Sequence, residues 1–193
     1  MNWTKEFIDW LKQGDEDANT YLDIPWDVNT AKDGHLDVIE AYHPKMPFSI
    51  RITMSKHYAS MSIDMAYPTA NLDLGYRLEI YSKLLEMNAM FNLIKACVKE
   101  EDKGIILMVD LDLECVNRIE FNDALTLLIV GCHYVVEMLG IEERVSNYMR
   151  EQTTIITNNK IASGESREQI MDYLLHRVGL DEVFAGEFLS SLK

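Results

Sequence analysis

The sequence predicts an α+β fold, with a five-stranded antiparallel sheet, helices on one face of it and a C-terminal helical extension. Three observations predict this fold. Two neighbouring runs, 48–54 and 59–65, alternate between apolar and polar residues, as half-buried antiparallel strands do. A third run, 104–113, alternates in the same way, and a long apolar helix follows it. The predicted order is helix, three strands, helix, two strands, helix over residues 1–140, with the extension over residues 141–193.

The composition is that of a globular protein and disfavours several classes of partner. The chain has 193 residues and a formal net charge of -14, with lysine and arginine scattered one or two at a time. Such a surface repels phosphate backbones and anionic lipids, so we expect neither nucleic acid nor a membrane as a partner. The N-terminus has no signal-peptide pattern, and Cys97, Cys115 and Cys132 show no CxxC spacing. We therefore expect a cytoplasmic protein with free thiols.

The first helix is predicted over Trp3–Lys12, where apolar residues recur at helical spacing. Thr4 is the expected N-cap, because its hydroxyl can accept a hydrogen bond from the first turn. Gly14 and the polar residues after it end the helix. Tyr21–Gly34 mixes apolar residues with acids and turn formers, and we interpret it as an extended connector.

Three strands are predicted next. Leu36–Tyr42 is rich in strand formers and ends at the turn signal His43-Pro44. Phe48–Met54 and Ala59–Met65 each place apolar residues on one face and polar residues on the other. They predict a meander with one buried and one solvated face, which Pro68 closes.

A helix and a hairpin follow the meander. Arg77–Phe91 carries apolar residues at the i, i+3, i+4 spacing of a helix. Leu93–Lys99 and Gly104–Leu113 alternate again and are separated by four residues, so they predict two further strands joined by a tight turn.

The last helix of the domain is predicted over Arg118–Leu139. Asn117 and Glu120 form a capping box at its start, and Gly140 ends it. From Ala124 onward the helix is apolar on much of its circumference, which predicts burial on more than one side. We therefore expect a homodimer, with the helix contributing to the partner surface through Leu128, Cys132, Val135 and Val136.

The C-terminal extension is predicted to be helical. Ile141–Ile156 continues as an amphipathic helix, and the polar run Thr157–Gly164 is interpreted as a linker. Ser166 and Gln169 form a second capping box, which begins a helix that Gly179 stops. A last short helix follows, so the extension resembles a helical hairpin.

The central run LLEMNAMFNLIKACVKEEDKGIILMVDLDLECVNRIEFNDAL resembles the type III secretion chaperone-like fold. It is closest in style to the YbjN family, whose members are described as sensory-transduction regulators. The resemblance covers roughly Trp3–Leu139, and the connector and the tail from Ile141 lie outside its pattern. It implies a non-enzymatic binding protein, often a homodimer, that holds another polypeptide. The matching residues are Leu84, Leu85 and Asn88 at the helix end, Asp102–Gly104 at the hairpin turn, and Leu111–Leu113 at the strand exit.

Ile106 and Met108 are the residues that most directly indicate a partner surface. By alternation they fall on the outer face of their strand, where an apolar side chain would be exposed unless a partner covers it. Six methionines also gather around the strands and the second helix. They either fill the core or line a surface for an apolar peptide, because thioether side chains adapt to varied neighbours. These methionines are Met54, Met61, Met65, Met87, Met90 and Met108.

Asp110, Asp112 and Glu114 form the alternative functional site, because they recur at period two along one strand. Several carboxylates together could bind Ca²⁺ or Mg²⁺, although the outer face of a half-buried strand is polar in any case. The run lacks the glycine and turn of a calcium loop. The alternative function is therefore a small metal- or ligand-dependent enzyme that uses this acidic face.

Motifs for catalysis and cofactors do not occur in the sequence. There is no G-x-S-x-G, no P-loop and no G-x-G-x-x-G, and the five histidines show no HxH or HExxH pairing. His133 lies within the apolar helix and is expected in the core or at an interface. We expect no catalytic residues, no cofactor and no metal.

The function predicted from the sequence is that of a chaperone-like or regulatory adaptor, a homodimer that binds a polypeptide without catalysing a reaction. A related hypothesis makes the C-terminal hairpin a lid over the peptide-binding surface. In that case deletion of Ser166–Lys193 should raise the affinity for the partner.

Overall fold

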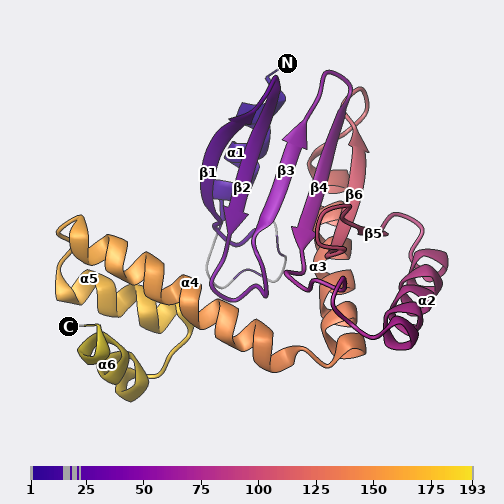
Figure 1. The fold of residues 1–193 in the computed structure, drawn as a ribbon. Helices are drawn as coiled ribbons and strands as arrows, with labels where there is room; N and C mark the ends of the chain where they lie inside the picture. Colours follow the sequence, from indigo (N-terminus) through magenta and orange to yellow (C-terminus); the bar gives the residue numbers. More distant parts are fainter. Residues whose placement is uncertain (1, 15–17, 19–20, 22, 193) are drawn as a thin grey trace. The chain divides into compact units, whose positions relative to one another are not determined.

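The computed structural model describes residues 2–14, 18, 21 and 23–192 and contains two compact units (Figure 1). The first consists of Met1–His43 and Phe48–Ile141, and we call it the sheet unit. The second consists of Pro44–Pro47 and Glu142–Lys193, and we call it the helical unit. The chain therefore leaves the sheet unit briefly after His43 and finally after Ile141.

The sheet has six antiparallel strands in the order β1-β2-β3-β4-β6-β5. The prediction of five strands was wrong by one, because β1 forms from the connector Tyr21–Gly34. Its sequence DVNTAKD is mostly exposed, so it shows no alternation of apolar and polar residues. The strands are β1 (Asp27–Asp33), β2 (Leu36–Tyr42), β3 (Ile50–Met54), β4 (Tyr58–Asp64), β5 (Lys95–Val98) and β6 (Ile105–Asp112).

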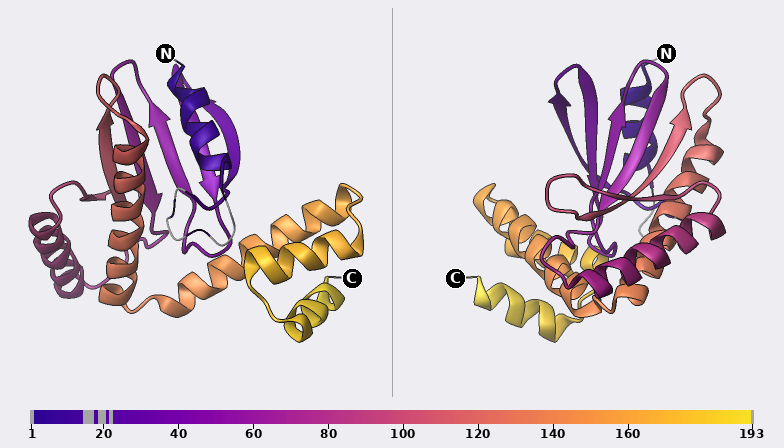
Figure 2. Two further views of the ribbon diagram at one scale, coloured as in Figure 1. Left: turned by 180° about the vertical axis from the view of Figure 1, so that it is seen from behind. Right: turned by 45° about the vertical axis from the view of Figure 1, so that its right-hand side comes forward.

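Two helices cover one face of the sheet, as the view from behind shows (Figure 2). They are α1 (Trp3–Lys12) and α3 (Arg118–Leu139). The rings of Phe7 and Phe121 join the two helices, with centroids 4.6 Å apart. Both rings are fully buried, because the inner side chains of the sheet meet them.

The N-cap of α3 is the predicted one, whereas the N-cap of α1 differs from the prediction. Asn117 and Glu120 form the predicted capping box of α3. Asn2 caps α1 by accepting a hydrogen bond from the backbone N–H of Lys5, so the prediction of Thr4 as N-cap was wrong. The hydroxyl of Thr4 instead donates to Asp37 of β2 at 3.0 Å and ties α1 to the sheet.

The core of the sheet unit lies between the sheet and α1 and α3. Apolar side chains at alternate positions of β3, β4 and β6 point into it, as the predicted period of two requires. The largest fully buried side chains of this unit are Phe7, Phe121, Leu11, Ile39, Ile50, Ile52, Met61, Ile63, Met65, Met87 and Ile94.

Helix α2 (Leu74–Met90) packs beside β5. It begins three residues earlier than predicted because Asp73 caps it, accepting hydrogen bonds from the backbone of Gly75 and Tyr76. Near its end, Asn88 accepts from the backbone N–H of Ala96 at 2.6 Å and donates to the carbonyl of Ala96 at 3.2 Å. The amide of Asn88 thus bonds to the edge of β5 as a neighbouring strand would.

The helical unit contains α4 (Glu142–Ala162), α5 (Arg167–Asp172), a π-helix η1 (Tyr173–Val178) and α6 (Glu182–Ser191). The prediction of a linker over Thr157–Gly164 was wrong, because α4 continues to Ala162. Thr157 itself is fully buried, so its polar side chain does not mark a surface segment. The predicted capping box of Ser166 and Gln169 is present at the start of α5.

Among the helices of the described residues, α3 is the one that is long and apolar enough to cross a membrane. Its most apolar window has a mean hydropathy of 1.3, and 50% of that window is buried inside the structure. Ten of its residues lie in the core of the sheet unit. This burial shows that α3 is a core helix. A long apolar core helix meets the same criteria of length and composition as a membrane-spanning helix.

Candidate polypeptide-binding groove

A groove of about 700 Å³ lies within the helical unit. Its volume falls in the range of sites that hold small ligands or the anchoring side chains of a peptide. Most of the lining surface is apolar. The lining residues come from the loop after β2 (Pro44), from α4 (Ser146, Met149, Arg150, Thr153), from the end of η1 and its loop (Val178, Leu180) and from α6 (Phe184, Glu187, Phe188, Ser191).

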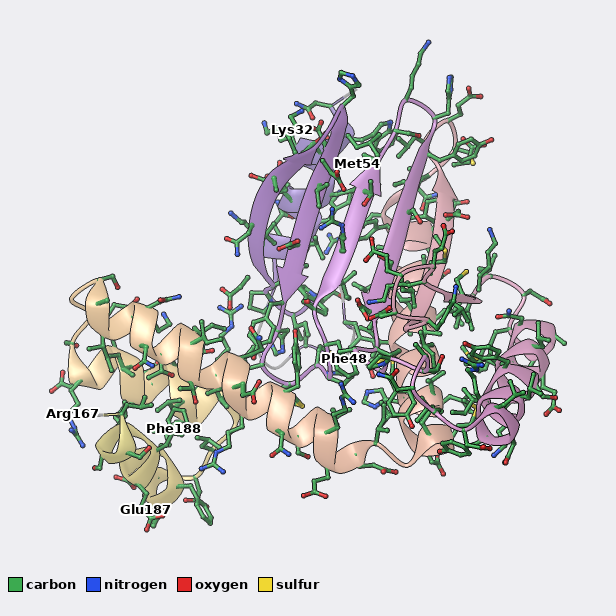
Figure 3. The ribbon with its side chains drawn as sticks, viewed as in Figure 1. Lys32, Phe48, Met54, Arg167, Glu187 and Phe188 are labelled. Carbon is green, nitrogen blue, oxygen red and sulfur yellow. The ribbon has the colours of Figure 1, made fainter. Side chains whose placement is uncertain are left out.

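Helix α6 supplies two aromatic side chains to this groove. Phe184 and Phe188 are four residues apart, so they lie on one side of the helix, one turn after the other. Ala185 and Leu189 are buried, whereas Phe184 is 62% exposed. Figure 3 labels Phe188 and the adjacent Glu187 on α6. An aromatic side chain that is this exposed and lies beside a groove is typical of a binding surface.

A separate hydrophobic core holds α6 in place. Ile170, Tyr173 and Leu174 pack with Ala185 and Leu189, and the ring of Phe188 packs against this cluster at its rim. Asp181 begins α6 by accepting a hydrogen bond from the backbone N–H of Phe184. The groove wall is therefore fixed by packing beneath it and by a cap at its start.

The π-helix η1 ends at the groove. The wider turn of a π-helix is rare and often occurs at functional sites. Gly179 follows it with a φ of +82°, a conformation that glycine adopts without strain. The chain then folds back, so that the N–H of Leu180 donates to the carbonyl of Leu174 at 3.0 Å. This reversal places both Val178 and Leu180 in the lining.

The polar groups of the groove divide into two kinds. The hydroxyls of Thr153 and Ser191 donate to carbonyls of their own helices, those of Met149 at 2.9 Å and Phe188 at 2.7 Å. Arg150 of α4 and Glu187 of α6 instead bring one positive and one negative charge to the lining. An apolar groove with one charge of each sign can fix the orientation of a bound segment.

The residues predicted for a partner surface lie in two environments. Ile106 and Met108 are partly buried on the face of β6 opposite α3, where the thiol of Cys97 lies 3.5 Å from the sulfur of Met108. The four residues of α3 lie in the core of the single chain, on the side of the helix that the sheet covers. They are Leu128, Cys132, Val135 and Val136.

The acidic residues of the alternative site have separate contacts. Asp110 accepts a hydrogen bond from Lys95 at 2.6 Å, and this bond holds the pKa of the Asp110 carboxyl below its usual value. Asp112 accepts from the backbone N–H of Glu114 at 2.9 Å. In the described part of the chain, no three side chains of the metal-binding types are placed to share an ion.

The methionines and histidines singled out in the sequence have different surroundings. Met54, Met61, Met65 and Met87 fill the core, whereas Met90 is 58% exposed. His133 is exposed on α3, so it does not lie in the core, and its place at an interface stays a prediction. His43 is the fully buried histidine, and its ring meets that of Trp26 with centroids 5.8 Å apart.

The groove itself was not predicted from the sequence, although one signal for it is present. In α6, Phe184 and Phe188 accompany Ala185 and Leu189, so apolar residues occupy two adjacent sides of a short helix. One side packs on the core, and the other is available to a ligand. The contributions of Val178 and Leu180 depend on the π-helix, for which the sequence has no recognisable pattern.

Comparison with known families gives one match. A family model described as "Domain of unknown function (DUF8183)" matches residues 6–139. No curated protein matches the chain. The matched residues coincide with most of the sheet unit, and the residues that line the groove lie beyond them, except Pro44.

Proposed function

The chain belongs to the family described as a domain of unknown function (DUF8183), and we propose that it is a non-enzymatic polypeptide-binding protein. The observation that carries the proposal is the apolar groove of the helical unit, with Phe184 exposed beside it. Grooves between helices recurrently bind amphipathic helices, whose apolar side chains enter at i, i+3, i+4 and i+7. The groove is long enough for side chains from more than one turn, since it is lined by residues 146–153 of α4 and 184–191 of α6.

The charges of the groove define the expected ligand further. Arg150 favours an acidic residue on the bound segment, and Glu187 favours a basic one. The ligand is therefore an amphipathic helical segment with an apolar stripe and one charge of each sign beside it. Binding of such segments is the activity of an adaptor or a chaperone-like protein. The resemblance to the type III secretion chaperone-like fold supports the same class of function.

A homodimer is part of the proposal. The support is a stripe of leucines along α2, where Leu74, Leu78 and Leu85 are 59%, 57% and 68% exposed. Their spacing of four and seven residues places them on one side of the helix. Burial of such a stripe against its own copy would remove the apolar surface from water. The cytoplasm is the proposed location, because the acidic composition and the free cysteines fit a reducing compartment.

A peptide selection tests the groove. The full chain is used to enrich peptides from a random library, and the affinity of each enriched peptide is then measured by fluorescence anisotropy. We expect amphipathic helical peptides that bind wild type, and affinity lowered by about tenfold or more in Phe184→Asp, because a carboxylate would be desolvated in an apolar groove.

The matched control is Val183→Asp. Val183 neighbours Phe184 on α6 and is 69% exposed, but it does not line the groove. This variant should bind the peptides as wild type does. Two outcomes would contradict the proposal. One is an equal loss of peptide affinity in both variants, and the other is enrichment of peptides that bind Phe184→Asp as tightly as wild type.

A further inference from the structure

The two edge strands of the sheet differ in how their outward backbone groups are bonded. At one edge, the amide of Asn88 bonds to both backbone groups of Ala96 and occupies the centre of β5. At the other edge lies β1, which is seven residues long. Five consecutive residues of β1, from Asn29 to Asp33, are exposed. An edge strand of this length presents a row of N–H and C=O groups to which another chain can bond.

The register of β1 and β2 shows which groups these are. The turn Gly34-His35 pairs Asp33 with Leu36, and Gly34 has a φ of +59°, as a two-residue hairpin turn requires. Hydrogen-bonded and non-hydrogen-bonded pairs then alternate along the hairpin. The N–H and C=O groups of Val28, Thr30 and Lys32 therefore point away from β2, toward the position of a further strand.

The side chains at this edge favour a basic ligand. Asp27 and Asp33 lie at the two ends of β1, on the sheet face opposite α1. Arg51 of β3 reaches both Asp33 at 2.9 Å and Glu40 at 3.1 Å. One guanidinium thus pairs with the carboxylates of Asp33 and Glu40, so these three side chains together carry a net negative charge. Opposite charges directly across two strands stabilise the pairing of the strands.

The same charges disfavour a second copy of this chain at the edge. Antiparallel pairing of two β1 strands over their full length would place Thr30 opposite Thr30. Asp27 of each copy would then lie opposite Asp33 of the other. Like charges directly opposite each other destabilise a pair of strands. The edge is therefore suited to a different polypeptide.

A groove beside the strand provides room for side chains of that polypeptide. It has a volume of about 450 Å³ and is lined by α1 residues, among them Lys5 and Ile8, and by Thr30–Lys32 of β1. Every second side chain of an added strand would point to this groove. Figure 3 labels Lys32 on β1 at this edge, where it pairs with Asp37 of β2.

We propose that β1 binds an extended segment of a partner protein as a seventh strand, with lysine or arginine of that segment opposite Asp27 and Asp33. Strand addition of this kind takes its affinity from backbone hydrogen bonds and its specificity from alternate side chains. The surface belongs to the sheet unit and is independent of the groove between α4 and α6.

Amide hydrogen exchange followed by NMR on the full chain tests the proposal. The probe is a synthetic seven-residue peptide of alternating valine and threonine with a lysine at each end, and its twin carries a glutamate at each end. We expect the lysine peptide to protect the amides of Val28, Thr30 and Lys32 and to bind about tenfold or more tightly than its twin. No protection at about 1 mM peptide, or equal binding of the twins, would overturn the proposal.

Two variants of Thr30 and one variant of the groove complete the test. Thr30→Pro removes an outward N–H without breaking a bond to β2, and proline is tolerated on edge strands. It should abolish binding of the lysine peptide, whereas Thr30→Ala and Phe184→Asp should keep it. Binding of the lysine peptide by Thr30→Pro would overturn the proposal. So would protection of the same amides that increases with protein concentration in the absence of peptide, because a second copy of the chain would then occupy the edge.

Discussion

Single side chains in this protein form the hydrogen bonds of backbone groups at a sheet edge and at the ends of helices. Asn88 is the clearest case, since one amide satisfies both backbone groups of Ala96. In the sequence, Asn88 stands out only as part of the helix end that resembles the chaperone-like fold. The sequence does not show which groups the amide of Asn88 bonds to. The structure supplies that reason, because α2 runs beside β5. Local sequence patterns identify caps such as Asn117 with Glu120, whose partners are close in the chain, more readily than contacts eight residues apart.

Substitution Asn88→Ala should destabilise the sheet unit. It leaves the N–H and C=O of Ala96 without their partner, at a cost of roughly 1–3 kcal/mol. Asn92→Ala is the matched control, because Asn92 undergoes the same change at an exposed position in the bend between α2 and β5. Urea unfolding followed by tryptophan fluorescence measures the effect on the sheet unit, which contains all three tryptophans, Trp3, Trp10 and Trp26. Equal midpoints for the two variants would contradict this role of Asn88.

The cysteines provide a second prediction at this scale. Cys132 is fully buried, and burial raises the pKa of its thiol to about 12. Cys115 is exposed, and desolvation and the nearby carboxylates raise the pKa of its thiol above its usual value. Because the thiolate is the reactive form, iodoacetamide should label Cys115 faster as pH rises toward its pKa. Cys132 should stay unlabelled until denaturant is added. Mass spectrometry measures both sites, and equal labelling of Cys132 in the native chain would place it on a surface instead.

Whole elements were predicted best where they are half buried. The strands β3, β4 and β6 each have a buried face and a wetter face, so the sequence shows their period of two. Strand β1 has little buried surface, and its place in the sheet depends on pairing with β2 through the turn at Gly34. Helix α4 continues past its polar residue Thr157 because the helical unit buries that residue. Tertiary packing overrode local composition in both cases.

Gly14 controls how the chain returns from α1 to β1. A Cβ atom at Gly14 would lie 2.5 Å from the carbonyl carbon of Ile24 and 2.6 Å from the nitrogen of Pro25. Because backbone atoms cannot move aside cheaply, Gly14→Ala should destabilise the sheet unit by roughly 1–3 kcal/mol. The nearby N–H of Trp26 donates to the carbonyl of Leu11 at 2.8 Å, so tryptophan fluorescence should also report the displacement.

Gly186→Ala is the control at the same scale. A Cβ atom there meets nothing within 4 Å, and alanine is favoured over glycine in a helix interior by about 1 kcal/mol. This variant should leave tryptophan fluorescence unchanged and stabilise α6 slightly, as measured by circular dichroism during unfolding. An unfolding midpoint of the sheet unit that Gly14→Ala leaves unchanged would contradict the close approach at Gly14.

At the scale of the whole molecule, the chain is two units with separate cores and separate candidate surfaces. The composition predicted the acidic, globular character, and the boundary near Gly140 was visible as a change in pattern. The binding groove could not be predicted, because it is assembled around a π-helix from segments far apart in the chain, from Pro44 to Ser191. The hypothesis of a C-terminal lid places binding elsewhere. Deletion of Ser166–Lys193 would remove α6 and with it the groove, so the affinity for the polypeptide should fall. The lid hypothesis predicts that the same deletion raises this affinity.

The proposed homodimer gives a prediction at this scale. Light scattering at micromolar concentration should give about twice the 22.3 kDa mass of the chain. The double variant Leu78→Glu with Leu85→Glu should be a monomer, because it places charges in the leucine stripe of α2. Ile119→Glu is the control, since Ile119 is 74% exposed on α3 and lies outside that stripe. A monomeric wild type, or a double variant that remains dimeric, would contradict this surface.

The most direct test of polypeptide binding in the groove is methyl NMR of Met149. Met149 lines the groove, whereas Met61 is fully buried in the sheet unit, and the chain has 11 methionines to resolve. The spectrum of the full chain is recorded while a library-selected peptide is added, and Met149→Leu assigns the resonance. The methyl signal of Met149 should shift with the peptide concentration while that of Met61 stays in place. A bound peptide that leaves Met149 unchanged and shifts the methyl groups of the sheet unit would contradict the account.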